Sequence, residues 1–201
     1  AGTLQSWIEL WFSTYRLTGN DVNENKLFPL LVAYYYFRDA FPVDQRQSHD
    51  RFVEALGELH ARALSSYKGL NNRYTKHLRL VAICGLILDR AVWVDSARAG
   101  VKRFVEESLY GDGESVDLRS RDSLTYHSSA LRPVLQLLML GGEEGRALYS
   151  WENAEGGSLK RSVDYVVPFA MGEKTREEWK NSQAPLDRKR AAEGIEKYRI
   201  G

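Results

Sequence analysis

Long segments with helical spacing of apolar side chains constrain this chain most strongly. Residues 4–17 place their large side chains three or four positions apart, which puts them on one face of a helix. These side chains are Leu4, Ile8, Trp11, Phe12 and Tyr15. Only five prolines occur among 201 residues, so few positions oppose helix formation. The pattern therefore predicts an all-α fold.

Seven further segments show a helical pattern. They are residues 27–40, 44–64, 73–88, 94–109, 124–140, 143–149 and 159–171. Segment 27–40 is so uniformly apolar that a buried strand is its alternative. Asp44 is a candidate cap for the third helix, and Pro133 is expected to kink the sixth. We expect seven or eight helices in antiparallel hairpins, forming one domain over residues 1–201, with 187–201 as a peripheral helix or a tail.

Charge and cysteine usage exclude several classes of protein. The net charge of +1 argues against a general nucleic-acid binder. Cys84 is the single cysteine, which excludes internal disulfides and a multi-cysteine zinc site. It lies in an apolar run, and this position predicts an inert thiol. The four histidines have no metal-ligand spacing. No apolar stretch reaches the roughly 18 residues of a membrane span. We therefore expect no metal, no cofactor and no membrane partner.

The small net charge hides an uneven distribution. Residues 1–61 carry five Lys or Arg against eight Asp or Glu, a balance of −3. Residues 62–103 carry nine against two, a balance of +7. This basic segment is either a set of solvated helix faces or an anion-binding groove.

The first polar cluster stands at a helix start, in residues 69–77. Asn71, Asn72, Arg73 and His77 are its candidate ligand-binding side chains. Amide and guanidinium groups beside a helix N-terminus are suited to a carboxylate. The alternative is that the asparagines only cap the helix.

The second polar cluster, residues 117–131, leads into the most apolar helix. Ser123 is a candidate cap, and Tyr126 and His127 follow within the helix. If Arg119 or Arg121 lay beside Tyr126, it would stabilise a phenolate suited to proton transfer. The alternative is that Tyr126 and His127 are hydrogen-bonded core residues.

The third cluster, residues 153–161, contains Gly156 and Gly157 followed by Lys160. The glycines would allow close approach of a ligand, and Lys160 would contact an anionic group. The alternative is a flexible loop followed by an ordinary helix.

In this order, the blocks NNR, RSRDSLTYHSSAL and ENAEGGSLKRSVDYVVPF resemble the alginate lyase superfamily of polysaccharide lyases. The resemblance covers roughly residues 65–185. The family pattern is an Asn-Asn-His triplet, then an arginine several residues before a Tyr-His pair. Members of the family are helical (α/α) toroids. Because toroid lyases are longer than 201 residues, the resemblance implies a short or incomplete toroid, or a piece of a larger protein.

The resemblance also implies roles for single residues. Tyr126 matches the catalytic tyrosine, Asn72 the asparagine that binds the uronate carboxylate, and Arg119 the arginine that approaches both tyrosine and substrate. Arg121 competes with Arg119 for that role. The resemblance implies secretion or a periplasmic location, although the chain shows no signal peptide.

Arg73 departs from the family pattern, because the best-known branch has a catalytic histidine there. An arginine stays protonated and is no general base. Either Tyr126 alone or His77, one helical turn further on, must then take the proton. The sequence is similar to branches that act on alginate or glucuronan with one tyrosine as base and acid.

The expected function is therefore metal-independent β-elimination of an anionic polysaccharide, with mannuronate-rich alginate as the leading substrate. One tyrosine can serve both steps when the C5 hydrogen and the leaving oxygen lie on the same side of the ring, as in mannuronate. Where they lie on opposite sides, a second group such as His77 or His127 would be needed. The remaining alternative is a helical domain that binds polyuronate without cleaving it.

Overall fold

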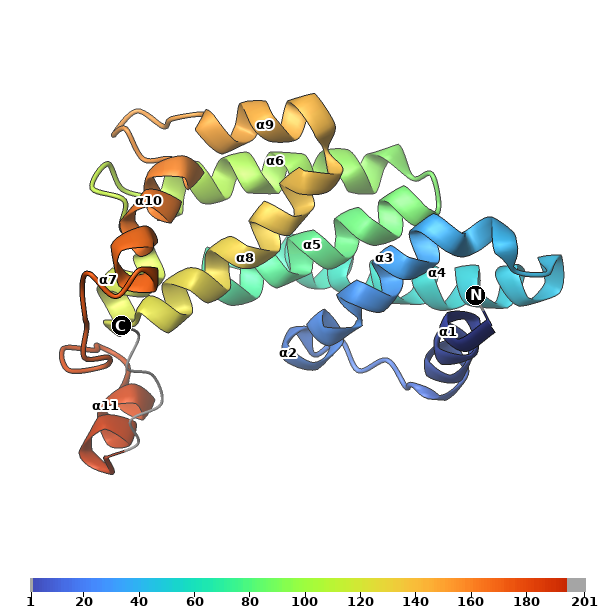
Figure 1. The fold of residues 1–201 in the computed structure, drawn as a ribbon, viewed down its shortest axis with the longest axis horizontal. Helices are drawn as coiled ribbons and strands as arrows, with labels where there is room; N and C mark the ends of the chain where they lie inside the picture. The colour runs from blue at the N-terminus through green and yellow to red at the C-terminus, as the bar shows by residue number, and fades with distance from the viewer. Residues whose placement is uncertain (1, 195–201) are drawn as a thin grey trace. The chain divides into compact units, whose positions relative to one another are not determined.

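The structure, a computed structural model, describes residues 2–194 as an all-α protein (Figure 1). No strand occurs in this range, apart from an isolated bridge between Leu109 and Ser115. The predicted fold class is confirmed, and the strand alternative for residues 27–40 is wrong. The toroid stays a prediction. No helix of residues 2–194 is long and apolar enough to cross a membrane.

The helices follow one another along the chain, with two short 3-10 segments, η1 and η2, around α3. Their bounds are α1 Gly2–Thr14, α2 Asp21–Glu24, η1 Asn25–Leu27, α3 Phe28–Phe37, η2 Arg38–Ala40, α4 Val43–Ser66, α5 Asn72–Ile87, α6 Ala91–Ser108, α7 Val116–Arg121, α8 Leu124–Leu140, α9 Gly142–Ser150, α10 Leu159–Ala170 and α11 Pro185–Ala192.

The predicted helices are present, and the sequence pattern missed only short ones. Helices α2, α7 and α11 have four to eight residues, too few to show a periodic apolar face. The bounds of α8 agree with the predicted 124–140. Asp44 lies in the first turn of α4 and does not cap it, because Pro42 occupies the N-cap position. Helix α11 covers part of the predicted peripheral segment, and the rest of that segment lies beyond the described residues.

The chain divides into two compact units, and each is described by itself. Unit 1 comprises Ala1–Lys68 and Lys76–Gly100, and unit 2 comprises Gly69–Thr75 and Val101–Gly201. Helices α5 and α6 each contribute to both units. The prediction of a single domain stays a prediction.

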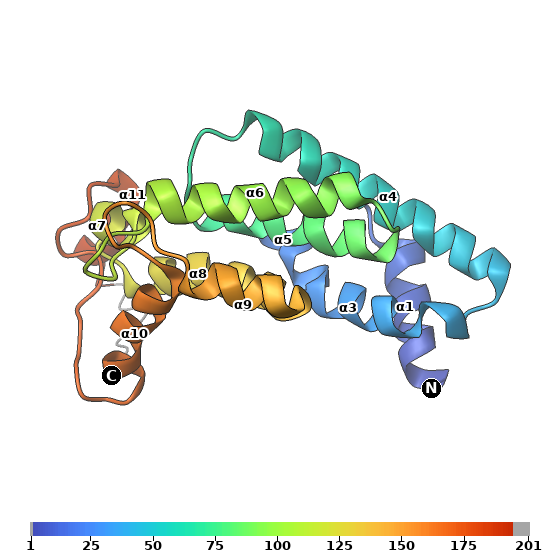
Figure 2. The ribbon, with the colours of Figure 1, turned by 90° about the horizontal axis from the view of Figure 1, so that it is seen from above.

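Aromatic side chains form the core of unit 1 where α1 packs across α4 (Figure 2). Phe12 stacks on Phe52 at a centroid distance of 4.6 Å and meets Tyr34 edge to face. On the apolar face of α1, Ile8 and Phe12 are buried. Trp11 is 40% exposed, and Leu4 is also exposed.

Glycines permit close helix packing in both units. In unit 1, a Cβ at Gly57 of α4 would lie 2.2 Å from the ring of Trp93 in α6. In unit 2, α9 folds back from Gly141 along α8 (Figure 1). A Cβ at Gly145 would lie 2.0 Å from the Leu138 carbonyl oxygen. These contacts hold the α8–α9 hairpin tight, and α8 carries the candidate site at its other end.

Candidate functional site

Two caps in succession place Tyr126 in the first turn of α8. Ser115 caps α7 by accepting a hydrogen bond from the backbone N–H of Leu118. Helix α7 ends at Asp122, whose φ of 45° reverses the chain direction. Ser123 then caps α8 by accepting from the backbone N–H of Tyr126 at 3.2 Å, as the sequence predicted. The chain turns sharply here, and this turn brings Arg121 of α7 close to Tyr126.

Two guanidinium groups contact the half-buried Tyr126. The Cζ atom of Arg121 lies over its ring, 4.0 Å from the centroid. Arg190 of α11 donates a hydrogen bond from Nη1 to the phenol oxygen at 3.1 Å. Cations in these positions stabilise negative charge on the phenol oxygen.

The carboxylate of Asp187 lies next to both arginines, Arg121 and Arg190. Its side chain is fully buried and forms an ion pair with Arg121, in which Nη2 lies 2.7 Å from Oδ1. Nη1 of Arg190 lies 3.7 Å from Oδ1 of the same carboxylate. Burial alone would raise the pKa of the Asp187 carboxyl, but hydrogen bonds from Arg121 and Ser182 hold that pKa below its usual range. Asp187 therefore stays ionised and fixes the arginines.

The polar segment before α11 is tied to the junction of α7 and α8. Asp122 is the centre of this attachment, since its backbone oxygen accepts from the N–H of Trp179 and its carboxylate accepts from the N–H of Asn181, both at 2.7 Å. Glu178 accepts from Ser123 Oγ and from the N–H of Thr125. This attachment brings Asp187 and Arg190 to Tyr126.

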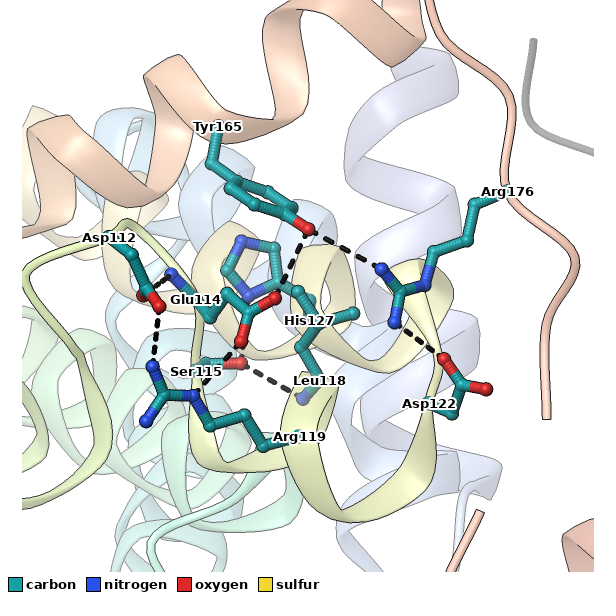
Figure 3. A network of polar contacts seen from close by, with 9 residues as sticks. All are labelled: Asp112, Glu114, Ser115, Leu118, Arg119, Asp122, His127, Tyr165 and Arg176. Atoms are coloured by element: carbon teal, nitrogen blue, oxygen red, sulfur yellow. Dashed lines mark hydrogen bonds and ion pairs between the residues drawn. The ribbon is translucent and has the colours of Figure 1, made fainter. Parts of the chain in front are cut away.

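Arg119 has different partners (Figure 3). Its Nε donates to Glu114 at 2.9 Å, and Nη2 pairs with Asp112. Its Cζ lies 3.5 Å from the ring centroid of Tyr110. The structure thus places Arg121, and not Arg119, against Tyr126. A role of Arg119 in catalysis stays a prediction.

A second tyrosine, Tyr165 of α10, belongs to the same polar network. It donates to Glu114 at 3.3 Å and accepts from Arg176 at 3.4 Å, and Arg176 also pairs with Asp122 (Figure 3). Burial, and next the charge of Glu114, raise the pKa of Tyr165. Sequence reasoning gave Tyr165 no role, although it lies in the third block of the family resemblance. It missed Arg176, which lies outside every polar cluster and block.

Similarity to known proteins identifies the kind of site. Residues 8–176 match the family model described as Alginate lyase. The chain belongs to the alginate lyase family. The suspected relationship is thereby confirmed, and the protein is a polysaccharide lyase with an anionic polysaccharide as substrate. No curated protein and no solved structure matches the chain.

In this lyase, the Asn-Asn pair lies at the start of α5, within unit 2. Asn71 accepts from the backbone N–H groups of Arg73 and Tyr74, so its side chain caps the helix. The N–H of Asn72 donates to Asp117 at 2.7 Å. Asp187 most strongly, and Asp117 at longer range, raise the pKa of Arg121. Asp117 therefore links Asn72 to the surroundings of Tyr126.

His127 lies in the core of the lyase. It is fully buried, its Nδ1 lies 2.7 Å from Ser115 Oγ, and its Nε2 lies 3.2 Å from the Ser162 backbone oxygen. This position agrees with the alternative of a hydrogen-bonded core residue. A role of His127 toward substrate stays a prediction.

His77 lies in unit 1, in a chain of buried groups. Its Nδ1 lies 2.8 Å from Nδ1 of His60, and His60 Nε2 lies 2.8 Å from Glu24 Oε2. All three side chains are buried. The proposed use of His77 as a base stays a prediction.

The remaining candidates, Arg73 and Lys160, lie outside the core. Arg73 is exposed, and Lys160 forms a surface ion pair with Asp164 at 2.6 Å, one turn along α10. Their roles toward substrate stay predictions. Cys84 is buried and burial raises the pKa of its thiol, in agreement with an inert core residue. Residues 2–194 contain no group of three or more His, Cys, Asp or Glu side chains that could hold a metal ion.

Four arginines of the basic segment 62–103 have partners within their own unit. Arg79 donates to Asn25 and lies over the ring of Phe28, Arg90 pairs with Glu54, Arg98 with Asp95, and Arg103 with Glu107. These contacts favour the interpretation as paired and solvated helix faces over an anion-binding groove.

Proposed function

We propose that this polysaccharide lyase cleaves a polyuronate by β-elimination, with Tyr126 as both base and acid. The observation that carries the proposal is the pair of guanidinium groups at this phenol, Arg121 over the ring and Arg190 on the oxygen. Guanidinium groups at this phenol stabilise the negative charge that Tyr126 carries when it acts as the base. The proposed reaction is metal-independent and uses side chains of the protein alone.

The first step removes the proton at C5 of a uronate residue. This proton becomes acidic when the C6 carboxylate is neutralised, because negative charge then spreads onto the carboxylate as the C–H bond breaks. Asn72 and Arg73 are the proposed neutralising groups. Both belong to unit 2, as Tyr126 does.

In the second step, the electron pair at C5 forms the C4–C5 double bond as the glycosidic bond at C4 breaks. Tyr126 returns its proton to the leaving oxygen and becomes a phenolate again. Arg121 and Arg190 then stabilise the same charge that they stabilised before the first step, so the residue is ready for another cycle.

The use of one tyrosine favours mannuronate. In a mannuronate chain, the C5 hydrogen and the leaving oxygen lie on the same side of the ring, within reach of one phenol. Poly-guluronate would require a second proton carrier on the opposite side of the ring, because guluronate is the C5 epimer of mannuronate. Both histidines considered for that task, His77 and His127, are buried. Mannuronate-rich alginate is therefore the proposed substrate. Glucuronan is the second candidate, because glucuronate has the same configuration as mannuronate at C4 and C5.

The test is to incubate the purified lyase with poly-mannuronate, poly-guluronate and polyglucuronate and to follow the ultraviolet absorbance of the unsaturated product. The expected result is the fastest rise with poly-mannuronate. A preference for poly-guluronate would exclude the single-tyrosine mechanism, and a preference for polyglucuronate would make glucuronan the substrate in place of alginate. Absence of product from all three would show that the domain binds polyuronate without cleaving it or acts on another polyanion.

A further inference from the structure

Unit 1 contains a pocket that Tyr126 and its partners do not use. It lies between the end of α1 and the segment from α2 to the start of α3, and its volume is about 560 Å³. Such a volume is within the range of roughly 300–1,000 Å³ typical of small-molecule pockets. Trp11, Tyr15, Asn23 and Lys26 are the lining residues that decide its chemistry.

Two aromatic rings form one wall. The ring centroids of Trp11 and Tyr15 are 6.1 Å apart, with an angle of 39° between the planes. Trp11 is 40% exposed although α1 offers a core on its other side. Sugar rings have faces made of C–H groups, and covering such a face with an aromatic ring removes apolar surface from water on both sides.

The opposite wall supplies polar groups of the matching kind. Lys26 is the charged residue among the described residues that line the pocket, and no carboxylate of residues 2–194 pairs with it. Its ammonium group is suited to a sugar carboxylate, and the amide of Asn23 is suited to hydroxyl groups. A second pocket, in unit 2, is lined by Glu106, Glu152 and Glu155 and would repel the same ligand.

The segment that carries Lys26 is held by hydrogen bonds within the protein. Asn20 caps α2 through two backbone N–H groups. Glu24 is buried and accepts from the backbone N–H groups of Thr18 and Gly19. Arg79 donates to the backbone oxygen of Asn25 at 2.9 Å. A preformed pocket spends little binding free energy on ordering its own chain.

We propose that this pocket is a uronate-binding subsite, in which Trp11 and Tyr15 cover the face of a sugar ring and Lys26 binds its carboxylate. The identity of the ligand rests on the proposed function, because a polyuronate is the anionic polymer that this lyase would hold. The subsite binds the polymer and takes no part in bond cleavage.

The experiment follows binding in the Tyr126→Phe protein, which leaves the ligand intact. Tryptophan indoles are labelled with ¹⁵N, and a mannuronate hexasaccharide is added. The expected result is a saturable shift of the Trp11 indole signal, with no shift of Trp7, which is 56% exposed on the same helix but does not line the pocket. Lys26→Gln should weaken this binding about tenfold, and added salt should weaken it as well.

Three results would overturn the proposal. The first is no response of the Trp11 signal to the mannuronate hexasaccharide. The second is an equal shift of this signal with an uncharged glucose hexasaccharide. The third is a shift with protein concentration alone, which would indicate self-association. The turnover assay of the unmodified lyase separates this proposal from the proposed function. If polyuronate is cleaved and Trp11 stays silent, only the subsite is excluded; if Trp11 responds and no polyuronate is cleaved, only the catalytic proposal fails.

Discussion

Arg190 donates a hydrogen bond to the phenol oxygen of Tyr126 over 3.1 Å, although the two residues are 64 positions apart in the chain. Arg121 approaches the same phenol from α7, and Asp187 binds both arginines. Three residues from two distant segments thus surround one side chain. The predictions below test what each of them does.

The first prediction concerns the phenol itself. Tyr126→Phe removes the group that would carry the proton, and general acid–base catalysis contributes about 10²–10⁴-fold to a rate. We expect kcat on poly-mannuronate to fall by at least about 10²-fold, with an unchanged circular dichroism spectrum and melting temperature. A variant that keeps most of its activity would show that Tyr126 is not the base.

The second prediction distinguishes the arginines. Arg190→Gln removes one hydrogen bond to the phenol, and we expect kcat to fall about 10²-fold, as for other donors that stabilise developing charge. Lys189→Gln is the matched control, because Lys189 lies next to Arg190 in α11 with its side chain 72% exposed. Equal activities of the two variants would contradict the role of Arg190.

Arg119→Gln extends this comparison. Arg119 pairs with Asp112 and Glu114 and lies over the ring of Tyr110, so we expect a smaller loss of kcat than for Arg190→Gln. A larger loss would restore Arg119 to the position that the family resemblance implies.

The third prediction concerns the buried carboxylate. Asp187→Asn leaves Arg121 without its ion-pair partner, and we expect the free energy of unfolding at pH 7 to fall by about 2 kcal/mol. Because the pKa of Asp187 is lowered in the folded protein, its contribution is present above the ordinary value of about 3.9 and is lost as the pH falls through the folded pKa. Urea unfolding of both proteins between pH 7 and pH 3 measures the difference, which should shrink at the acidic end. A constant difference would show that the charge of Asp187 is not what stabilises the fold.

The fourth prediction concerns the histidine pair of unit 1. Burial lowers the pKa of His60, although Glu24 opposes the effect. Nδ1 of His60 and Nδ1 of His77 lie 2.8 Å apart, so one ring donates and the other accepts; two N–H groups would face each other if a further proton left both rings protonated. The unfolded chain accepts this proton near pH 6.5, so the stability present above that value decreases as the pH falls below it.

Urea unfolding between pH 8 and pH 5 tests this expectation. The double variant His60→Leu with His77→Leu should depend less on pH than the original protein does in that range. Equal slopes for the two proteins would show that the pair does not control acid stability.

The fifth prediction concerns the α8–α9 hairpin. Gly145→Ala would place a Cβ 2.0 Å from the Leu138 carbonyl oxygen, and backbone cannot move as easily as a side-chain end. We expect a loss of about 1–3 kcal/mol in the free energy of unfolding. Gly141→Ala is the control, because its nearest neighbour would be 3.4 Å away. Similar melting temperatures for the two variants would contradict the packing argument.

Sequence patterns predicted the parts of this site that depend on local structure. The bounds of α8, the cap at Ser123 and the cap at Asn71 each follow from residue types within a few positions of one another. The choice between Arg119 and Arg121 did not follow. Two positions along a helix differ by about 200° in direction, so the two side chains point to different sides of α7. The direction of α7 is set by its packing, which the pattern does not contain.

Arg190 and Asp187 were beyond prediction for a different reason. The segment that carries them is polar and has no periodic apolar side chains, so its sequence does not predict where its backbone runs. Its path depends on hydrogen bonds to Asp122 and on two left-handed residues, Asp122 and Trp179. These are contacts between distant parts of the chain, and residue spacing does not encode them.

The position of Arg190 has a consequence for synthesis of the protein. A ribosome adds about 5–20 residues per second, so Arg190 is made roughly 3–13 s after Tyr126. During this interval α7 and α8 are free to form, but the second cation of the phenol does not yet exist. If Arg190 is needed as proposed, the lyase acquires its activity late, when the peripheral segment docks, and the nascent chain is inactive until then.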